Sequence, residues 1–159
     1  MEKCRFCEIL NGDRQNEEIV YEDDYFIVLT DKFRKTSVGS ICLVIPKNHF
    51  KNILDLPPEY SEKLISILNL VNVALQKAFK SKAIRIWTAV NKEAGQSIFH
   101  CHIHLVPCNS LKDRIIASFP GIYDWKHRIF KLGNNKLEST VNFQLADKLR
   151  NHINTIKCQ

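Results

Sequence analysis

The sequence lacks any hydrophobic run that approaches the roughly 20 residues needed to span a membrane. It also shows no apolar segment of the signal-peptide kind after residues 1–5, MEKCR. We therefore expect a cytoplasmic protein, a compartment in which cysteines stay reduced. The six cysteines are scattered along the chain, and we interpret them as free thiols, some of which bind metal.

Internal repeats, low-complexity linkers and basic runs interleaved with aromatic residues are absent too. The 159 residues and 18.5 kDa suit one domain. A net charge of +6 and a pI near 9.0 favour anionic partners such as nucleotides. Because the lysines and arginines are dispersed, the charge does not mark a nucleic-acid surface, and neither a nucleic-acid nor a membrane partner is expected.

What is present is an alternation of short apolar runs with two helical patterns. The expected elements are a helical turn at 4–10, strands at 19–22, 25–29, 41–45 and 84–90, a histidine-bearing strand after the loop at 91–96, a long helix at 56–79 and a last helix with apolar positions from 141 to 156. Asp55 is the expected N-cap of the long helix, and Pro120-Gly121 and 133–135 are expected turns.

These elements predict an α+β fold. The loop before the histidine strand has only about seven residues, too few for a parallel crossover, so the strands are expected to be antiparallel. We predict an antiparallel five-stranded sheet packed with a long helix. The single domain would span residues 1–159, with a core over about 4–108 and a C-terminal extension over 109–159.

Three of the six histidines stand in the stretch QSIFHCHIHL, residues 96–105. On one strand, His100, His102 and His104 would share a face, roughly 6.5 Å apart at about 3.3 Å rise per residue. The opposite face, toward the core, would carry Phe99, Cys101, Ile103 and Leu105. Such a face suits a metal site or catalysis by a neutral imidazole that attacks phosphorus, and the spacing alone does not choose between them.

The surrounding sequence resembles the histidine triad (HIT) family, most closely its bacterial Hint-type branch. The matching stretches are AGQSIFHCHIHLVP at 94–107, LVIPKNH at 43–49, CRFCEIL at 4–10 and VYEDDYFIVLTD at 20–31. The resemblance implies a homodimeric nucleotide hydrolase or transferase. It would cleave at the α-phosphate of a phosphoramidate or an adenylylated compound, with a purine mononucleotide-type substrate.

The same resemblance implies a role for individual residues. His102 would be the nucleophile that takes the nucleotidyl group, and His104 would contact the phosphate and help in proton transfer. Asn91, Gln96 and Ser97 would surround the phosphate, with Gly95 allowing close backbone approach. Asp31 would hold the ribose hydroxyls, while Phe6, Ile9 and Leu29 would line the base pocket, although ordinary core packing explains Phe6 and Leu29 as well.

A structural zinc ion is the expected cofactor. Cys4 and Cys7 form a thiolate pair of the kind that zinc uses, and a closed tetrahedral site needs two further ligands. In the branch that this sequence resembles, the histidines that correspond to His49 and His100 supply them. With four protein ligands, the ion would leave no position for water and would tie the N-terminus to the histidine segment.

The sequence departs from the family pattern at two positions. Family members generally carry another histidine just before the strand at 41–45, where this chain has Ser40 and Ile41, and Cys108 stands where arginine is common. The alternative among enzymes is a dinucleoside polyphosphate hydrolase. The missing histidine would also allow a nucleotide-binding regulatory module with little turnover. A zinc-stabilised nucleic-acid-binding protein is suggested only by the charge.

Overall fold

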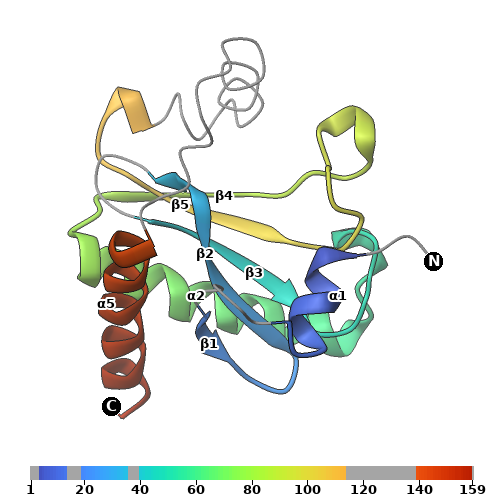
Figure 1. Ribbon diagram of the computed structural model, residues 1–159, viewed down its shortest axis with the longest axis horizontal. Coiled ribbons are helices and arrows are strands. Elements are labelled where there is room, and N and C mark those ends of the chain that lie inside the picture. Colours follow the sequence, from blue (N-terminus) through green and yellow to red (C-terminus); the bar gives the residue numbers. More distant parts are fainter. Residues whose placement is uncertain (1–3, 14–18, 36–39, 114–138, 159) are drawn as a thin grey trace.

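The computed structural model describes residues 4–13, 19–35, 40–113 and 139–158. Its centre is a five-stranded sheet of order β1-β2-β3-β5-β4, in which every neighbouring pair is antiparallel (Figure 1). The strands are β1 (Ile19–Glu22), β2 (Phe26–Lys35), β3 (Ser40–Pro46), β4 (Ala83–Trp87) and β5 (Ile103–Cys108). The predicted α+β fold with an antiparallel five-stranded sheet is confirmed.

One face of the sheet is covered by two helices, α2 (Pro58–Phe79) and α5 (Ser139–Lys157). Alternate strand residues such as Phe26, Val28 and Val44 are fully buried against them. From α5 the helix residues Leu149 and Ile153, four positions apart, enter the same core. Each such apolar side chain stabilises the fold by about 1.5–3 kcal/mol, so this layer fixes the position of the sheet.

The opposite face carries the short helix α1 (Arg5–Leu10). Phe6 and Ile9 of α1 pack with Ile27, Leu29 and Ile45 of β2 and β3 in a second buried cluster. Residues 27, 29 and 45 alternate with those that face α2, as the pleat requires. In Figure 1, α1 lies beside the end of β3, where the chain also turns back before β5.

The start of α2 corrects one expectation. Asp55 is not the N-cap of α2; that position is Pro57, which makes no side-chain cap. Asp55 instead ends the 3-10 helix η1 (Ile53–Asp55). Asn52 caps η1 by accepting from the Leu54 amide, and the Asp55 carboxylate accepts from the Asn52 amide at 3.2 Å. This reciprocal box satisfies the first turn of η1 and leaves α2 to begin with proline.

Two strand lengths also differ from prediction. β2 continues to Lys35 rather than ending at Leu29, and β4 ends at Trp87 rather than Val90. The turns expected at Pro120-Gly121 and 133–135 lie outside the described residues. None of the helices in the described ranges combines the length and the apolar character that crossing a membrane would need.

Candidate functional site

The three histidines of the 96–105 stretch do not share one strand. β5 begins at Ile103, so only His104 lies in it, and His100 and His102 lie in the irregular segment before it. The prediction of three histidines on one strand face is wrong because this segment is bonded elsewhere. The Cys101 amide donates to the Phe50 carbonyl at 2.7 Å, which draws the chain to the loop after β3.

The core-facing residues of the stretch are mostly as predicted. Cys101, Ile103 and Leu105 are buried in the cluster that contains α2. Phe99 is the exception, with 37% of its surface exposed. The Lys51 ammonium lies 5.6 Å from the centre of the Phe99 ring. Phe99 therefore belongs to the surface, since the regular alternation begins only after it.

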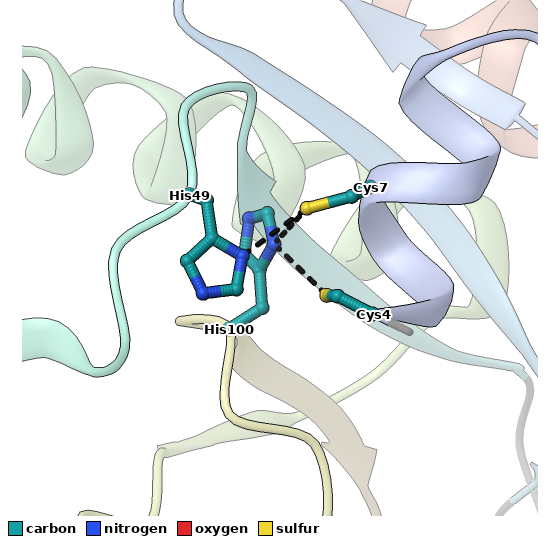
Figure 2. A group of neighbouring side chains, drawn as sticks. All are labelled: Cys4, Cys7, His49 and His100. Atoms are coloured by element: carbon teal, nitrogen blue, oxygen red, sulfur yellow. Dashed lines mark hydrogen bonds between the residues drawn. The ribbon is translucent and has the colours of Figure 1, made fainter. Parts of the chain in front are cut away.

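Four side chains from three separate segments meet beside α1 (Figure 2). They are Cys4 just before α1, Cys7 in α1, His49 after β3 and His100 before β5, and their ligand atoms all lie within 4.8 Å of one another. The Nδ1 atom of His100 is 3.5 Å from each sulfur, and the Nδ1 atom of His49 is 3.1 Å from the Cys7 sulfur.

This cluster, which we call the Cys/His cluster, fits a tetrahedral zinc ion. Bonds of about 2.3 Å to sulfur and about 2.0–2.1 Å to nitrogen place neighbouring ligand atoms about 3.5 Å apart. The sulfur–nitrogen distances of 3.1–3.5 Å agree with that spacing. The residues present therefore have the chemistry and the spacing for zinc.

The ring of His100 is oriented for metal binding by the backbone. Its Nε2–H donates to the carbonyl of Pro46 at 2.9 Å, so the lone pair lies on Nδ1, which faces both sulfurs. Metal-binding histidines are commonly held by such an outer hydrogen bond. Burial lowers the pKa of His100, and the nearby His49 and His102 lower it further, against the opposing effect of the Pro46 carbonyl. The ring is therefore neutral near pH 7, as a ligand must be.

The thiol of Cys7 has the opposite electrostatic setting. Burial, a hydrogen bond with Cys4 and the charge of Cys4 raise the pKa of Cys7 to about 11. Two thiolates side by side repel each other, so both ionise only when a cation compensates them. A divalent metal ion is the partner that this pair of sulfurs suits.

His102 lies next to the Cys/His cluster and is 9% exposed. Its Nδ1 atom is 2.7 Å from the carbonyl of His100. Because a carbonyl only accepts, Nδ1 carries the proton and Nε2 carries the lone pair. The ring centres of Phe6 and His102 are 5.3 Å apart, so α1 packs against this imidazole.

His104 is 3% exposed and is stacked on Trp87. The two ring centres are 3.9 Å apart and the planes differ by 2°. Thr88, which follows Trp87 in the chain, donates its hydroxyl hydrogen to the carbonyl of His102 at 2.8 Å. Neither Trp87 nor Thr88 was singled out by sequence reasoning. The only available signal was register, since Trp87 is directly opposite His104 in the β4–β5 pairing.

The loop residues predicted to surround a phosphate have different settings. Asn91, Gly95 and Ser97 are exposed, whereas Gln96 is 3% exposed. The Gln96 amide accepts from the Asn91 backbone N–H at 2.9 Å and donates to the carbonyls of Lys51 at 2.6 Å and Ile98 at 3.1 Å. Gln96 thus fastens the loop to the segment after β3.

The backbone of this loop is unusual at both ends. Asn91 has φ 69° and ψ 167°, a region that residues with a side chain rarely occupy. Gly95 has φ 92°, and a Cβ there would meet nothing within 4 Å. Glycine is thus required at position 95 by the backbone conformation, rather than by a close neighbour within the described structure.

The residues predicted to hold the nucleoside lie in α1 or on the face of the sheet that α1 covers. Phe6, Ile9 and Leu29 are buried in the α1 cluster, and Asp31 follows two positions after Leu29 on β2 with 5% exposure. The structure accounts for the three apolar residues by core packing. Their contact with a base, and that of Asp31 with a ribose, remain predictions.

A small α+β protein with a histidine-rich segment beside a Cys/His cluster is the class that this fold and site define. The sequence matches the HIT domain family over residues 13–111, and this chain belongs to the HIT family. The matched range contains His49 and the three clustered histidines, while Cys4, Cys7 and α5 lie outside it.

Individual relatives agree with this assignment. An uncharacterized HIT-like protein of Saccharolobus solfataricus is 36% identical over 116 residues, which are 73% of this chain and 81% of the relative. The adenylylsulfatase HINT3 of Arabidopsis thaliana is 33% identical over 104 residues, 65% of this chain and 51% of the relative. The crystal structure of a zinc-bound histidine triad family protein from Mycobacterium smegmatis shares the fold, with a TM-score of 0.72 at 24% identity over 98% of this chain and 96% of that one.

Proposed function

We propose that this protein is a nucleotide hydrolase or transferase that cleaves at an α-phosphate through a nucleotidyl group on His102. The observation that carries the proposal is the hydrogen bond from His102 Nδ1 to the His100 carbonyl, which leaves the lone pair on Nε2. A nucleophilic imidazole must be neutral and held in one tautomer. The similarity to a relative named as an adenylylsulfatase supports the same class of reaction.

The reaction has two displacements at phosphorus. His102 Nε2 attacks the α-phosphorus, and the bond from phosphorus to the leaving group breaks, whether that group is the amine of a phosphoramidate or the oxygen of an adenylylated compound. The leaving group takes the electron pair, and an amine also takes a proton with the help of His104. Water then attacks the phosphorus and gives up a proton with the help of His104. The phosphorus–nitrogen bond breaks, its electron pair returns to His102 Nε2, and the monophosphate is released. Asn91 and Ser97 would contact the phosphate oxygens, and Asp31 would accept hydrogen bonds from the ribose.

We propose further that the Cys/His cluster holds a structural zinc ion. Cys4, Cys7, His49 and His100 supply four ligands, so the site is closed and keeps no position for substrate. The zinc-bound relative from Mycobacterium smegmatis supports this choice of metal. The ion would compensate the two thiolates and hold α1 against the segment that carries His102.

A second candidate function is nucleotide binding with little turnover. Where family members carry a further histidine, Ile41 is 3% exposed and packs with Val106 and Cys108 in an apolar cluster. Among the described residues, position 41 therefore offers no imidazole to move a proton. A regulatory module would bind a mononucleotide tightly and leave a phosphoramidate intact. Cleavage of dinucleoside polyphosphates is the alternative among enzymes.

The test is to trap the intermediate. Adenosine 5′-phosphoramidate is mixed with the protein, the reaction is quenched in base, and digested peptides are searched for the added nucleotidyl mass. Because the tryptic peptide 93–112 contains all three clustered histidines, fragment ions must place the mass. We expect it on His102. An adduct on another residue, or release of monophosphate without an adduct in wild type and with equal speed in His102→Ala, contradicts the proposal.

The HIT resemblance also implies a homodimer, which we propose for this chain. β4 lies at the edge of the sheet, and its Ile86 is 48% exposed, a large apolar side chain on an outer strand. Light scattering after size exclusion should give twice the 18.5 kDa of one chain. Ile86→Lys should shift the mass toward one chain, with Leu54→Lys, at another exposed apolar position, as the control. A wild-type mass of 18.5 kDa over a range of concentrations would refute the dimer.

A further inference from the structure

The end of β4 contacts both histidines to which the proposed function assigns chemistry. Trp87, the last residue of β4, stacks on the ring of His104, and Thr88, directly after it, binds the backbone of His102. These contacts come from one side of β5, while α1 approaches His102 through Phe6. The two histidines are thus linked through two consecutive residues, the last residue of β4 and the residue that follows it.

The stack on His104 is held firmly by its surroundings. Trp87 and His104 are a directly opposed cross-strand pair, the closest arrangement that a sheet offers. Trp87 also packs against the apolar cluster of Ile41, Val106 and Cys108, which limits the movement of its ring. Since the planes are parallel within 2°, the imidazole cannot rotate about its axis without clashing with the indole.

The indole N–H of Trp87 has no hydrogen-bond partner among the described residues, although it is buried. A buried donor without a partner destabilises the fold, so an apolar side chain would fill this space at a lower cost in free energy. The ring face is therefore the part of Trp87 with an identified contact at the site. A phenylalanine would keep that face and lose no hydrogen bond seen here.

Thr88 acts where the β-ladder has ended. The β4–β5 ladder ends with the pair Trp87 and His104, and His102 precedes β5. The Thr88 hydroxyl donates to the His102 carbonyl at 2.8 Å and so continues the connection between the two segments with a side chain. The ring of His102 is held in turn by the His100 carbonyl.

We propose that Trp87 and Thr88 are positioning residues that fix His102 and His104 relative to each other. The rings of the two histidines stand 5.2 Å apart at 68°, an edge-to-face arrangement that lets one ring face phosphorus while the other reaches a leaving group. This inference rests on the proposed function. Neither residue reacts; both act through the histidine that they touch.

The first pair of variants separates ring stacking from filled volume. Trp87→Leu keeps an apolar side chain but removes the flat ring, whereas Trp87→Phe keeps a ring that can stack. We expect Trp87→Leu to lower kcat for adenosine 5′-phosphoramidate roughly 10- to 100-fold, the loss typical of a misplaced catalytic group, with KM within about twofold of wild type. Trp87→Phe should restore most of the lost kcat.

The second pair isolates the hydroxyl of Thr88. Thr88→Val has the same shape without the donor, and Thr88→Ser keeps the donor. Loss of one hydrogen bond that positions the backbone predicts a kcat reduced roughly three- to tenfold in Thr88→Val, and near wild type in Thr88→Ser. Melting temperatures are measured for all four variants, so that a general loss of stability is recognised.

A spectroscopic measurement reads the geometry without turnover. The indole ring current shifts the ring-proton resonances of His104 in carbon–proton correlation spectra. In Trp87→Leu these resonances should lose that shift, and the nuclear Overhauser contact between His102 and His104 should weaken; in Trp87→Phe both should persist. His104 resonances that are alike in wild type and Trp87→Leu would overturn the stacking.

The outcomes separate the two levels of the proposal. If wild type and His102→Ala are equally inactive or equally active, the proposed function fails and this inference fails with it. If wild type depends on His102 but Trp87→Leu and Thr88→Val turn over like wild type, the positioning inference alone is wrong. A loss of kcat in Trp87→Leu that Trp87→Phe does not restore also contradicts it, because volume at position 87 would then be the cause.

Discussion

Replacing His102 by alanine should lower turnover of an adenosine phosphoramidate by several orders of magnitude, the usual effect of removing a nucleophile. The neighbouring His100 does not replace it as the acceptor, since His100 directs its Nδ1 to the Cys/His cluster and donates its Nε2–H to the Pro46 carbonyl. Steady-state release of the monophosphate measures the effect. Binding of the monophosphate product, measured by calorimetry, should remain because the residues proposed to hold the nucleoside, Asp31 and the apolar side chains near α1, are unchanged.

His104→Ala is the graded comparison. Removing a residue that only assists proton transfer should lower kcat about 10²- to 10⁴-fold, which is less than the effect of removing the nucleophile. An effect of His104→Ala larger than that of His102→Ala would exchange the two assigned roles. Normal turnover by His102→Ala would exclude the nucleotidyl-histidine mechanism altogether.

Loss of metal should have the second large effect. Protein purified without chelator should contain about one zinc ion per chain, and Cys4→Ser/Cys7→Ser should contain none. Because binding energy at a structural metal site is folding energy, the double variant should melt at a lower temperature. A loss of about 3 kcal/mol would lower Tm by roughly 6–12 °C in a chain of this size. Metal analysis and calorimetry measure the two quantities.

Cys158→Ser is the matched control for the thiol substitutions. Cys158 is exposed at the end of α5 and takes no part in the Cys/His cluster. The Cys158→Ser variant should therefore keep its zinc and melt at the same temperature as wild type. Wild-type protein that contains no zinc would count against the metal site. So would a Cys4→Ser/Cys7→Ser variant that melts at the same temperature as wild type. Zinc affinity should also weaken as pH falls, because protons compete for thiols whose pKa is raised, as that of Cys7 is to about 11.

Those parts of the fold that depend on local periodicity were predictable. The interval of three and four between apolar residues located α2 and α5, and the run ICLVI located β3. The short loop before β5 gave the antiparallel pairing. Each of these signals reflects a chain segment that must bury one face, and such a segment carries its own pattern.

The parts that depend on contacts distant in sequence were not predictable. The segment that holds His100 and His102 leaves the strand geometry because the Phe50 and Pro46 carbonyls bind it, and backbone groups leave no mark in a sequence. The same is true of Gln96, whose amide is engaged with Lys51 and Ile98. The Cys/His cluster was anticipated from a family resemblance, since spacing along the chain relates Cys4 only to Cys7.

The last helix also protects the sheet from unwanted growth. Arg150 of α5 donates its Nε–H to the Ile19 carbonyl of β1 at 2.9 Å, and the Lys157 ammonium lies 4.8 Å from the centre of the Tyr21 ring. β1 is an edge strand, and unpaired backbone groups at an edge recruit other strands into aggregates. By occupying an acceptor on β1 and placing two cations beside it, α5 makes that edge a poor template. The edge at β1 should therefore recruit strands of other molecules less readily than the edge at β4, the other outer strand of the sheet.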